Sequence, residues 1–298
     1  MFEPGPCDAP AVMRRLWLCL ALCFICHAGM AEETKFSHAY GDNPEAGGYA
    51  DVNGISMYYE VYGEGEPLAL IHGSGQSIEA MKHQIEHFSK TYRVIVADSR
   101  AHGKSGLGEG TLTYAQMAED WLALFDRLGA EKTSVIGWSD GGNISLMMAI
   151  HHPGKVDKLA IMGANLQPDT SAVQPWAVEW VAVESKKIDE KLAAGDDSAN
   201  WAALKQQFGL LREQPDISLE QLAGVSSPVL VMAGDKDVIR GEHTLLMFQT
   251  LPKAHLAIFP GETHFTPDAN PALFNSTVEN FLGEPYSRPD TRDIMLGH

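Results

Sequence analysis

The pentapeptide Gly137-Trp138-Ser139-Asp140-Gly141 constrains the fold of this chain more than any other feature. It follows a short apolar run, Thr133–Ile136, and precedes a helix-forming segment, Gly142–Ile150. This is the G-x-S-x-G pattern in its strand–turn–helix setting. Such a turn holds the serine in a strained conformation, and the flanking glycines let neighbouring backbone approach closely. The pattern predicts that the Ser139 hydroxyl projects above the end of a sheet.

Apolar runs on both sides of this motif predict an alternation of strands and helices. Further strands are expected near Gly48–Val52, Ile55–Tyr62, Pro67–Ile71, Tyr92–Ala97, Val156–Met162, Val229–Ala233 and His255–Phe259. Asn53-Gly54 predicts a hairpin turn, and Thr113 with Gln116 predicts a capping box for a helix that runs to about Leu128. The alternation indicates an α/β fold with a doubly wound, mostly parallel sheet that binds ligands at the carboxyl ends of its strands.

Residues 165–226 interrupt this alternation. They carry several helical patterns and many charges but no clear strand, and they contain three of the six tryptophans, Trp176, Trp180 and Trp201. We therefore predict a small helical cap, inserted before the strand Val229–Ala233. These tryptophans either contact a ligand or hold the cap on the core.

The first 31 residues have the pattern of a secretory signal. Arg14-Arg15 precede the apolar run Leu16–Cys26, and small residues follow at Ala28–Ala31. The apolar run is short for a membrane span, although an N-terminal anchor is the alternative. We expect cleavage, a mature domain of residues 32–298 without stable membrane insertion, and export to a bacterial periplasm or the medium. All four cysteines lie in this segment, so the mature domain would have no disulfide and no cysteine ligand.

Composition excludes some classes of partner. The 298 residues, 45% of them hydrophobic, are enough for one large core. The net charge of −17 argues against nucleic acid, which is bound through clustered Lys and Arg. No ligand motif indicates a metal or another cofactor, so we expect none and expect a small-molecule partner. Nothing in the sequence indicates an oligomeric state.

A histidine and two aspartates complete a candidate catalytic group with Ser139. His264 lies in the loop Gly261–Phe265 near the end of the chain, where it can reach a serine at a strand tip. Asp235 and Asp237 both follow the strand Val229–Ala233. Either position is open for an acid that orients the histidine.

The chain order of serine, acid and histidine resembles that of the α/β-hydrolase family. The resemblance covers about residues 48–283. The family's G-x-x-D pattern at Gly234–Asp237 implies that Asp237 is the acid and that Asp235 is a turn residue bonded to its own loop. His72-Gly73-Ser74 resembles the family's H-G-x motif, which implies an oxyanion hole formed by the Ser74 and Asp140 N–H groups.

Within this family, Gly137–Gly142 together with Gly163-Ala164-Asn165 is most similar to the biphenyl hydrolase-like (valacyclovir hydrolase) group. Serine at the elbow excludes the epoxide hydrolase and dehalogenase branches, which carry aspartate there. Ala101 departs from the family pattern, where glycine usually precedes the histidine.

The resemblance implies a serine hydrolase that cleaves carboxylic esters through an acyl-enzyme, with Ser139 as nucleophile and His264 as base. Aminoacyl esters, lactones, amides and C–C bonds are alternatives on the same machinery. A ligand receptor without catalysis is the rival from another class.

Asp140 and Trp138 are the candidate substrate-binding residues. A carboxylate beside a developing oxyanion opposes the charge being stabilised. Asp140 would therefore suit a cationic group, such as the α-amino group of an aminoacyl ester. The alternative is that Asp140 only stabilises the N-terminus of the following helix.

Overall fold

The computed structural model describes residues 38–297. The predicted signal segment, residues 1–31, lies outside the described residues, and so do all four cysteines. Between residues 38 and 297, no helix is both long enough and apolar enough to cross a membrane.

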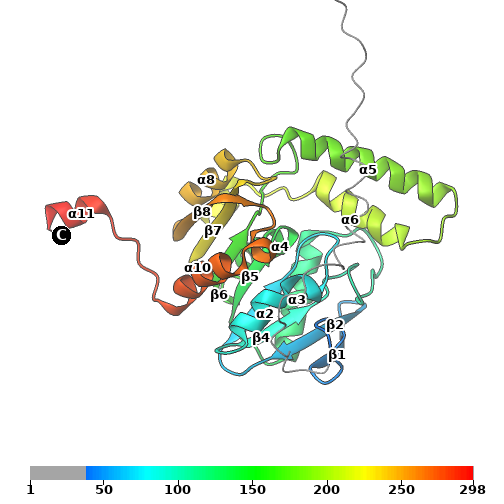
Figure 1. Cartoon of the computed structure of the whole chain (residues 1–298), viewed down its shortest axis with the longest axis horizontal. Coiled ribbons are helices and arrows are strands. Elements are labelled where there is room, and N and C mark those ends of the chain that lie inside the picture. Colours follow the sequence, from blue (N-terminus) through cyan, green and yellow to red (C-terminus); the bar gives the residue numbers. More distant parts are fainter. Residues whose placement is uncertain (1–37, 298) are drawn as a thin grey trace, which may run out of the picture. The chain divides into compact units, whose positions relative to one another are not determined.

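Eight strands of the described chain form one sheet, in the order β1-β2-β4-β3-β5-β6-β7-β8 (Figure 1). They are β1 (Gly47–Val52), β2 (Ile55–Tyr62), β3 (Pro67–Ile71), β4 (Arg93–Ala97), β5 (Thr133–Trp138), β6 (Val156–Met162), β7 (Val229–Lys236) and β8 (Ala254–Thr263). The pairs β1–β2 and β2–β4 are antiparallel, and every other neighbouring pair is parallel. The predicted α/β fold with a mostly parallel sheet is confirmed.

The central strands are buried because helices cover both faces of the sheet. Leu68–Ile71 in β3 and Val94–Ala97 in β4 are buried without alternation, as is typical of parallel strands covered on both faces. At the β1–β2 hairpin, Asn53 and Gly54 have φ values of +41° and +79°. These positive angles are what a two-residue type I′ turn requires, so the predicted hairpin is confirmed.

The helices of the described chain lie partly in two layers around the sheet and partly outside these layers. They are α2 (Lys82–Phe88), α3 (Tyr114–Arg127), α4 (Asp140–His151), α5 (Pro175–Ala193), α6 (Trp201–Glu213), α7 (Leu219–Ala223), α8 (Gly241–Thr250), α9 (Thr266–Ala269), α10 (Pro271–Gly283) and α11 (Thr291–Leu296), with a 3₁₀ turn η1 (Ile78–Met81). α2 packs with α9 and α10 on one face. On the other face α3 packs with α4, α4 with α7, and α7 with α8.

The start of α3 corrects one prediction. Thr113 Oγ1 accepts a hydrogen bond from Gln116 N at 3.0 Å, as a capping residue should. The Gln116 side chain does not return the bond: its Nε2 donates to Asp120 Oδ1 at 3.2 Å. The predicted capping box is therefore only half present, because the buried Asp120 carboxylate attracts the amide.

The segment predicted as a cap contains α5, α6 and α7, which lie between β6 and β7 in the chain. α5 and α6 pack against each other. Gln207 Nε2 donates to Ala101 O at 2.6 Å, and Gln206 Oε1 accepts from Leu112 N at 3.0 Å. These two bonds attach α6 to the long loop between β4 and α3.

The three tryptophans of this segment have different surroundings. Trp201 is 8% exposed, and its Nε1 donates to Asp196 Oδ1 at 2.9 Å, so it helps to hold the α5–α6 connection. Trp176 is 60% exposed and Trp180 is 43% exposed. Only these two are available for contact with a ligand.

The segment before β1 is attached to the sheet by Glu60 in β2. This buried carboxylate accepts hydrogen bonds from Gly41 N and Asn43 N, both at 2.8 Å. It also accepts from the hydroxyls of Tyr58 and Tyr62, both at 2.7 Å. Four donors compensate the cost of burying the charge.

Candidate active site

Ser139 occupies a sharp turn between β5 and α4. Its backbone angles are φ +57° and ψ −117°, a region that residues other than glycine rarely adopt. Its N–H donates to Met162 O at the end of β6, at 2.7 Å. A Cβ on Gly137 would collide with the backbone of Gly141, and a Cβ on Gly141 would collide with the backbone of Ile71. The close approach predicted from the glycines is therefore present.

His264 and Asp237 form a buried hydrogen-bonded pair at the ends of β8 and β7. His264 Nδ1 donates to Asp237 Oδ1 at 2.7 Å. The same carboxylate accepts from Ile239 N at 3.0 Å and from Gly234 N at 3.3 Å. These backbone donors fix the carboxylate in one orientation, and the carboxylate in turn fixes the tautomer and direction of the imidazole.

Asp235 has a different surrounding. It is exposed, and its Oδ2 accepts a hydrogen bond from Gly261 N in β8 at 2.9 Å. The prediction that Asp235 bonds to its own loop is wrong in this detail. The register of β7 against β8 places the two strand ends side by side, so the nearest donor comes from the neighbouring strand.

The imidazole of His264 lies against Gly163, just after β6. A Cβ on Gly163 would be 2.5 Å from His264 Cε1 and 2.6 Å from Nδ1. Since Ser139 N binds the adjacent Met162 O, both Ser139 and His264 contact this strand end. No hydrogen bond joins Ser139 Oγ to the imidazole among residues 38–297, and such contacts often tighten only when a ligand binds.

Trp138 is placed beneath the surface rather than on it. Its side chain is 2% exposed, and its Nε1 donates to His264 O at 2.8 Å. Its ring meets that of Phe265 edge to face, with 5.9 Å between the centroids. The described contacts of this predicted substrate-binding residue are therefore with the histidine loop.

The loop after β3 lies directly beside the elbow. A Cβ on Gly73 would be 3.1 Å from Ser139 Cβ. His72 fixes this loop, because its Nδ1 donates to Gly73 O at 2.8 Å and its Nε2 accepts from Ser99 N at 3.0 Å. Burial lowers the pKa of His72 to about 4, so the imidazole stays neutral as these bonds require.

The two amides predicted for the oxyanion hole belong to this loop and to the first turn of α4. Within the described chain, neither Ser74 N nor Asp140 N donates to a protein acceptor. An N–H at the start of a helix also lies at the positive end of the helix dipole. Both groups are therefore free to bind an anionic oxygen.

The Asp140 side chain is buried next to the elbow. Its Oδ1 accepts from the Tyr114 hydroxyl at 2.8 Å, and Oδ2 has no hydrogen-bond partner in the described residues. Burial raises the pKa of Asp140 to about 6, although the Tyr114 hydroxyl, the Ser74 side chain and the nearby His264 oppose the shift. The contribution of Tyr114 was not apparent in the sequence, because the tyrosine lies 26 residues away on α3.

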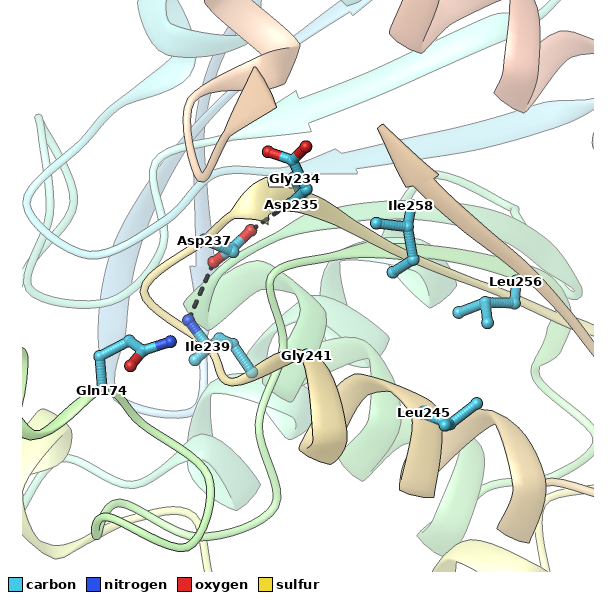
Figure 2. A pocket seen from close by; sticks show the side chains of 9 residues that line it. All are labelled: Gln174, Gly234, Asp235, Asp237, Ile239, Gly241, Leu245, Leu256 and Ile258. Atoms are coloured by element: carbon cyan, nitrogen blue, oxygen red, sulfur yellow. Dashed lines mark hydrogen bonds between the residues drawn. The ribbon is translucent and has the colours of Figure 1, made fainter. Parts of the chain in front are cut away.

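A cavity of about 340 Å³ adjoins the loop that carries the acid. Figure 2 shows the Asp237 carboxylate bonded between the backbones of Gly234 and Ile239, with Gln174 nearby. Leu245 of α8 and Ile258 of β8 supply apolar lining. The lining includes Asp237 but not Ser139, so this cavity lies beside the acid rather than at the elbow.

No group of three or more His, Cys, Asp or Glu side chains in the described part of the chain is arranged to hold a metal ion. The polar groups gathered at the elbow are a hydroxyl, an imidazole paired with a carboxylate, and two unpaired N–H groups. This set is suited to attack on an acyl carbon and to stabilisation of the oxyanion that results.

Known proteins resemble this chain in sequence and in fold. A family model described as the alpha/beta hydrolase fold matches residues 66–187. The (E)-2-((N-methylformamido)methylene)succinate hydrolase of Acinetobacter baylyi is 35% identical over 253 residues, covering 77% of this chain and 95% of that protein. The serine hydrolase BPHL of Mus musculus is 28% identical, covering 78% and 84%. An esterase from Thermogutta terrifontis has a TM-score of 0.66 at 22% identity, covering 81% and 99%.

The chain belongs to the α/β-hydrolase family. It is a hydrolase, with the sheet order of that family and with its elbow between β5 and α4. The match to BPHL also confirms the predicted resemblance to the biphenyl hydrolase-like group.

Proposed function

We propose that this hydrolase cleaves carboxylic esters of small molecules through a covalent acyl-enzyme. The proposal is carried by the buried 2.7 Å hydrogen bond from His264 Nδ1 to Asp237 Oδ1, beside a serine in an elbow conformation. A carboxylate bound at Nδ1 leaves Nε2 as the nitrogen that can accept a proton. These side chains and water are sufficient for the reaction, and we propose no cofactor.

In the proposed reaction, His264 Nε2 accepts the proton of Ser139 Oγ as the oxygen attacks the acyl carbon. The oxyanion that forms is bound by the N–H groups of Ser74 and Asp140. The intermediate collapses, and the alcohol leaves with the proton from His264. Water then loses a proton to His264 and attacks the acyl carbon, which releases the acid and regenerates Ser139. Asp237 remains ionised throughout.

Ser139→Ala tests this proposal. We expect it to abolish ester hydrolysis and labelling by a fluorophosphonate, with the fold intact by circular dichroism. Ser134→Ala, at a half-buried serine of β5, the strand that leads to Ser139, is the matched control and should label fully. Labelling that persists in Ser139→Ala would place the nucleophile elsewhere. Absence of labelling in the unaltered protein would favour a non-catalytic receptor.

The substrate class can be defined by one screen. The resemblance to an esterase supports esters, while lactones, amides and C–C bonds use the same machinery. We propose to compare p-nitrophenyl esters, lactones and aminoacyl esters at equal concentration. Esters should give the highest kcat/KM. A lactone that exceeds every ester would replace the ester proposal.

A preference for amine-bearing esters is a second candidate, favoured by one observation. Among residues 38–297, Asp140 Oδ2 is buried beside the elbow and accepts no hydrogen bond, and a carboxylate oxygen in such a place is costly unless a cation or donor binds it. An α-amino group on the acyl part of the substrate would supply that cation.

The measurement for this candidate is the ratio of kcat/KM for an aminoacyl ester and a plain acyl ester of the same alcohol. The ratio cancels the dependence on His264, which both substrates share. The pKa of Asp140 is raised to about 6, so the carboxylate is charged above that pH and neutral below it. The ratio should therefore fall as pH drops through about 6, and Asp140→Asn should remove this fall. An equal effect of Asp140→Asn on both esters would leave only the helix-dipole role.

A further inference from the structure

We propose that Trp138 is a positioning residue for His264, and that it acts through its indole N–H rather than by touching substrate. The inference rests on the proposed function, in which His264 is the base and Ser139 the nucleophile. Trp138 is the last residue of β5 and directly precedes Ser139. A contact between Trp138 and the loop of His264 therefore links the base to the residue next to the nucleophile.

The order of strands in the sheet separates Trp138, at the end of β5, from His264, after β8. β6 and β7 lie between β5, which leads to Ser139, and β8, which leads to His264. With strands spaced by about 4.8 Å, the ends of β5 and β8 are about 14 Å apart. The histidine loop must therefore reach back across two strand ends, and its position is not set by strand pairing with β5.

In the loop of His264, the backbone carbonyl of His264 itself is the one that bonds to Trp138. The carbonyls of Thr263 and Phe265, on either side of His264, accept bonds from donors within the loop and the short helix that follows. The His264 carbonyl instead accepts from Trp138 Nε1 at 2.8 Å. This bond connects the backbone of the base to the strand that carries the nucleophile.

The indole has little freedom to move. It is 2% exposed, its ring meets Phe265 edge to face, and its centroid lies 6.5 Å from that of the His264 ring. A donor held in this way fixes the acceptor as well, because close-packed interiors have few alternative arrangements.

Three contacts then define the position of the base. Asp237 sets the direction of the imidazole through Nδ1, and Gly163 sets how deeply the ring lies against the end of β6. Trp138 sets the place of the backbone from which the ring extends. Without the third contact, Nε2 would be displaced relative to Ser139 Oγ while the substrate-binding surface stays the same.

The test compares Trp138→Phe with Trp121→Phe. Trp121 is a matched control, because it is also buried, donates its Nε1–H to Ser99 Oγ at 3.2 Å, and packs edge to face on Phe125 in the core. We expect Trp138→Phe to lower kcat by about 10- to 100-fold with KM within about twofold, since small misplacements of reacting groups cost rate rather than binding. Trp121→Phe should lower stability with kcat nearly unchanged.

A second readout follows the base itself. The His264 Nδ1–H proton, in its short bond to Asp237, should give a downfield proton resonance. We expect it to shift or broaden in Trp138→Phe and to remain in Trp121→Phe. Replacing Trp138 with benzothienylalanine, which keeps the bicyclic shape but lacks the N–H, decides the matter if the phenylalanine variant does not fold.

Equal kcat values for the two phenylalanine variants, or an unchanged kcat with benzothienylalanine, would overturn the positioning role. Failure of the proposed function is distinguishable from this result, because the unaltered protein would then not react with a fluorophosphonate. The resonance of the His264–Asp237 bond reports on the Trp138 contact in either case.

Discussion

Asp235 and Asp237 are two residues apart, yet they bind partners with different consequences. Asp237 is buried and holds His264, whereas Asp235 is exposed and receives the Gly261 N–H. Both side chains are carboxylates at the end of the same strand, so residue type alone does not separate them. What separates the two aspartates is the burial of Asp237 and the backbone donor that the end of β8 offers to Asp235.

Asp237→Asn should lower kcat by about four orders of magnitude, because an amide at this place favours the wrong tautomer of the histidine. Asp235→Asn should change kcat by less than about threefold, since its partner is a backbone N–H that an amide oxygen can also bind. Steady-state kinetics on one p-nitrophenyl ester compares them. A larger loss in Asp235→Asn would move the acid to that residue.

Gly163→Ala should displace His264. The new Cβ would be 2.5 Å from His264 Cε1, in a backbone with φ of +64°. We expect at least about a 100-fold loss of kcat/KM. Gly129→Ala, at φ +69° with no atom within 4 Å of the new Cβ, carries the same backbone strain of about 1–2 kcal/mol without the collision. If both variants lose activity equally, the collision is not the cause.

At the residue scale, the sequence indicated the serine and the histidine as candidates through motif spacing and chain order, and the acid only through its resemblance to the family. It could not predict the bond from Trp138 to His264 or that from Tyr114 to Asp140. Each joins segments whose distance depends on the whole sheet. Gly163 belonged to the motif Gly163-Ala164-Asn165, but only the His264 imidazole packed against it explains why a glycine is needed there.

At the scale of elements, Arg100 and Asp120 join the loop after β4 to α3. Arg100 donates from Nε to Asp120 Oδ2 at 2.6 Å and from Nη2 to Oδ1 at 2.8 Å. The side chains are 5% and 0% exposed. Asn53 Nδ2 in the β1–β2 turn also donates to Asp120, so one carboxylate connects three elements.

Asp120→Ala should therefore lower the free energy of unfolding by about 3–5 kcal/mol, because it leaves the Arg100 charge buried and unpaired. Asp126→Ala, which breaks the pair of an exposed carboxylate with Lys155, should cost less than about 1 kcal/mol. Urea unfolding monitored by tryptophan fluorescence measures both. Similar losses in the two variants would contradict the importance of burial.

Strand positions followed well from apolar runs, but not every strand end did. β2, β3 and β6 have the bounds expected from the sequence. β8 continues to Thr263, beyond Pro260 and Gly261, because Lys236 of β7 pairs with Thr263. Two residues that usually mark a turn were overridden by a partner strand that the local sequence does not reveal.

At the scale of the whole molecule, three buried histidines make stability depend on pH. Burial lowers the pKa values of His72, His102 and His243 to about 4, about 3 and about 4. An unfolded chain binds these protons near pH 6.5, so the free energy of unfolding falls as pH drops from about 6.5 towards 4. Asp140 acts in the opposite direction below about pH 6, and so does Asp98, whose pKa is also raised by burial, but these are two groups against three.

His243→Gln should make this dependence shallower. The variant takes up one proton fewer on unfolding. The slope of the free energy of unfolding against pH should therefore fall by about 1.4 kcal/mol per pH unit near pH 5.5. Urea unfolding at several pH values between about 5 and 7 gives the slope for each protein. The variant will also lose stability at neutral pH, because His243 Nε2 accepts from Leu166 N at 3.0 Å. An unchanged slope would contradict the assignment.

Export remains a prediction, since residues 1–31 lie outside the described residues. Expressed with its full N-terminus in a bacterium, the protein should be recovered from the periplasm with a mass that begins near Glu32. An uncleaved chain in the membrane fraction would instead indicate an N-terminal anchor.

The four bonds to Glu60 set a limit on how the N-terminus can be handled. The first residue that they hold is Gly41, about ten positions after the predicted cleavage site. Processing at that site therefore leaves the attachment complete, and a purification tag fused ahead of residue 38 leaves it undisturbed. A chain shortened past Asn43 would lose two of the four donors and retain a buried carboxylate supported by tyrosine hydroxyls alone. Expression trials should therefore begin the chain before Gly41.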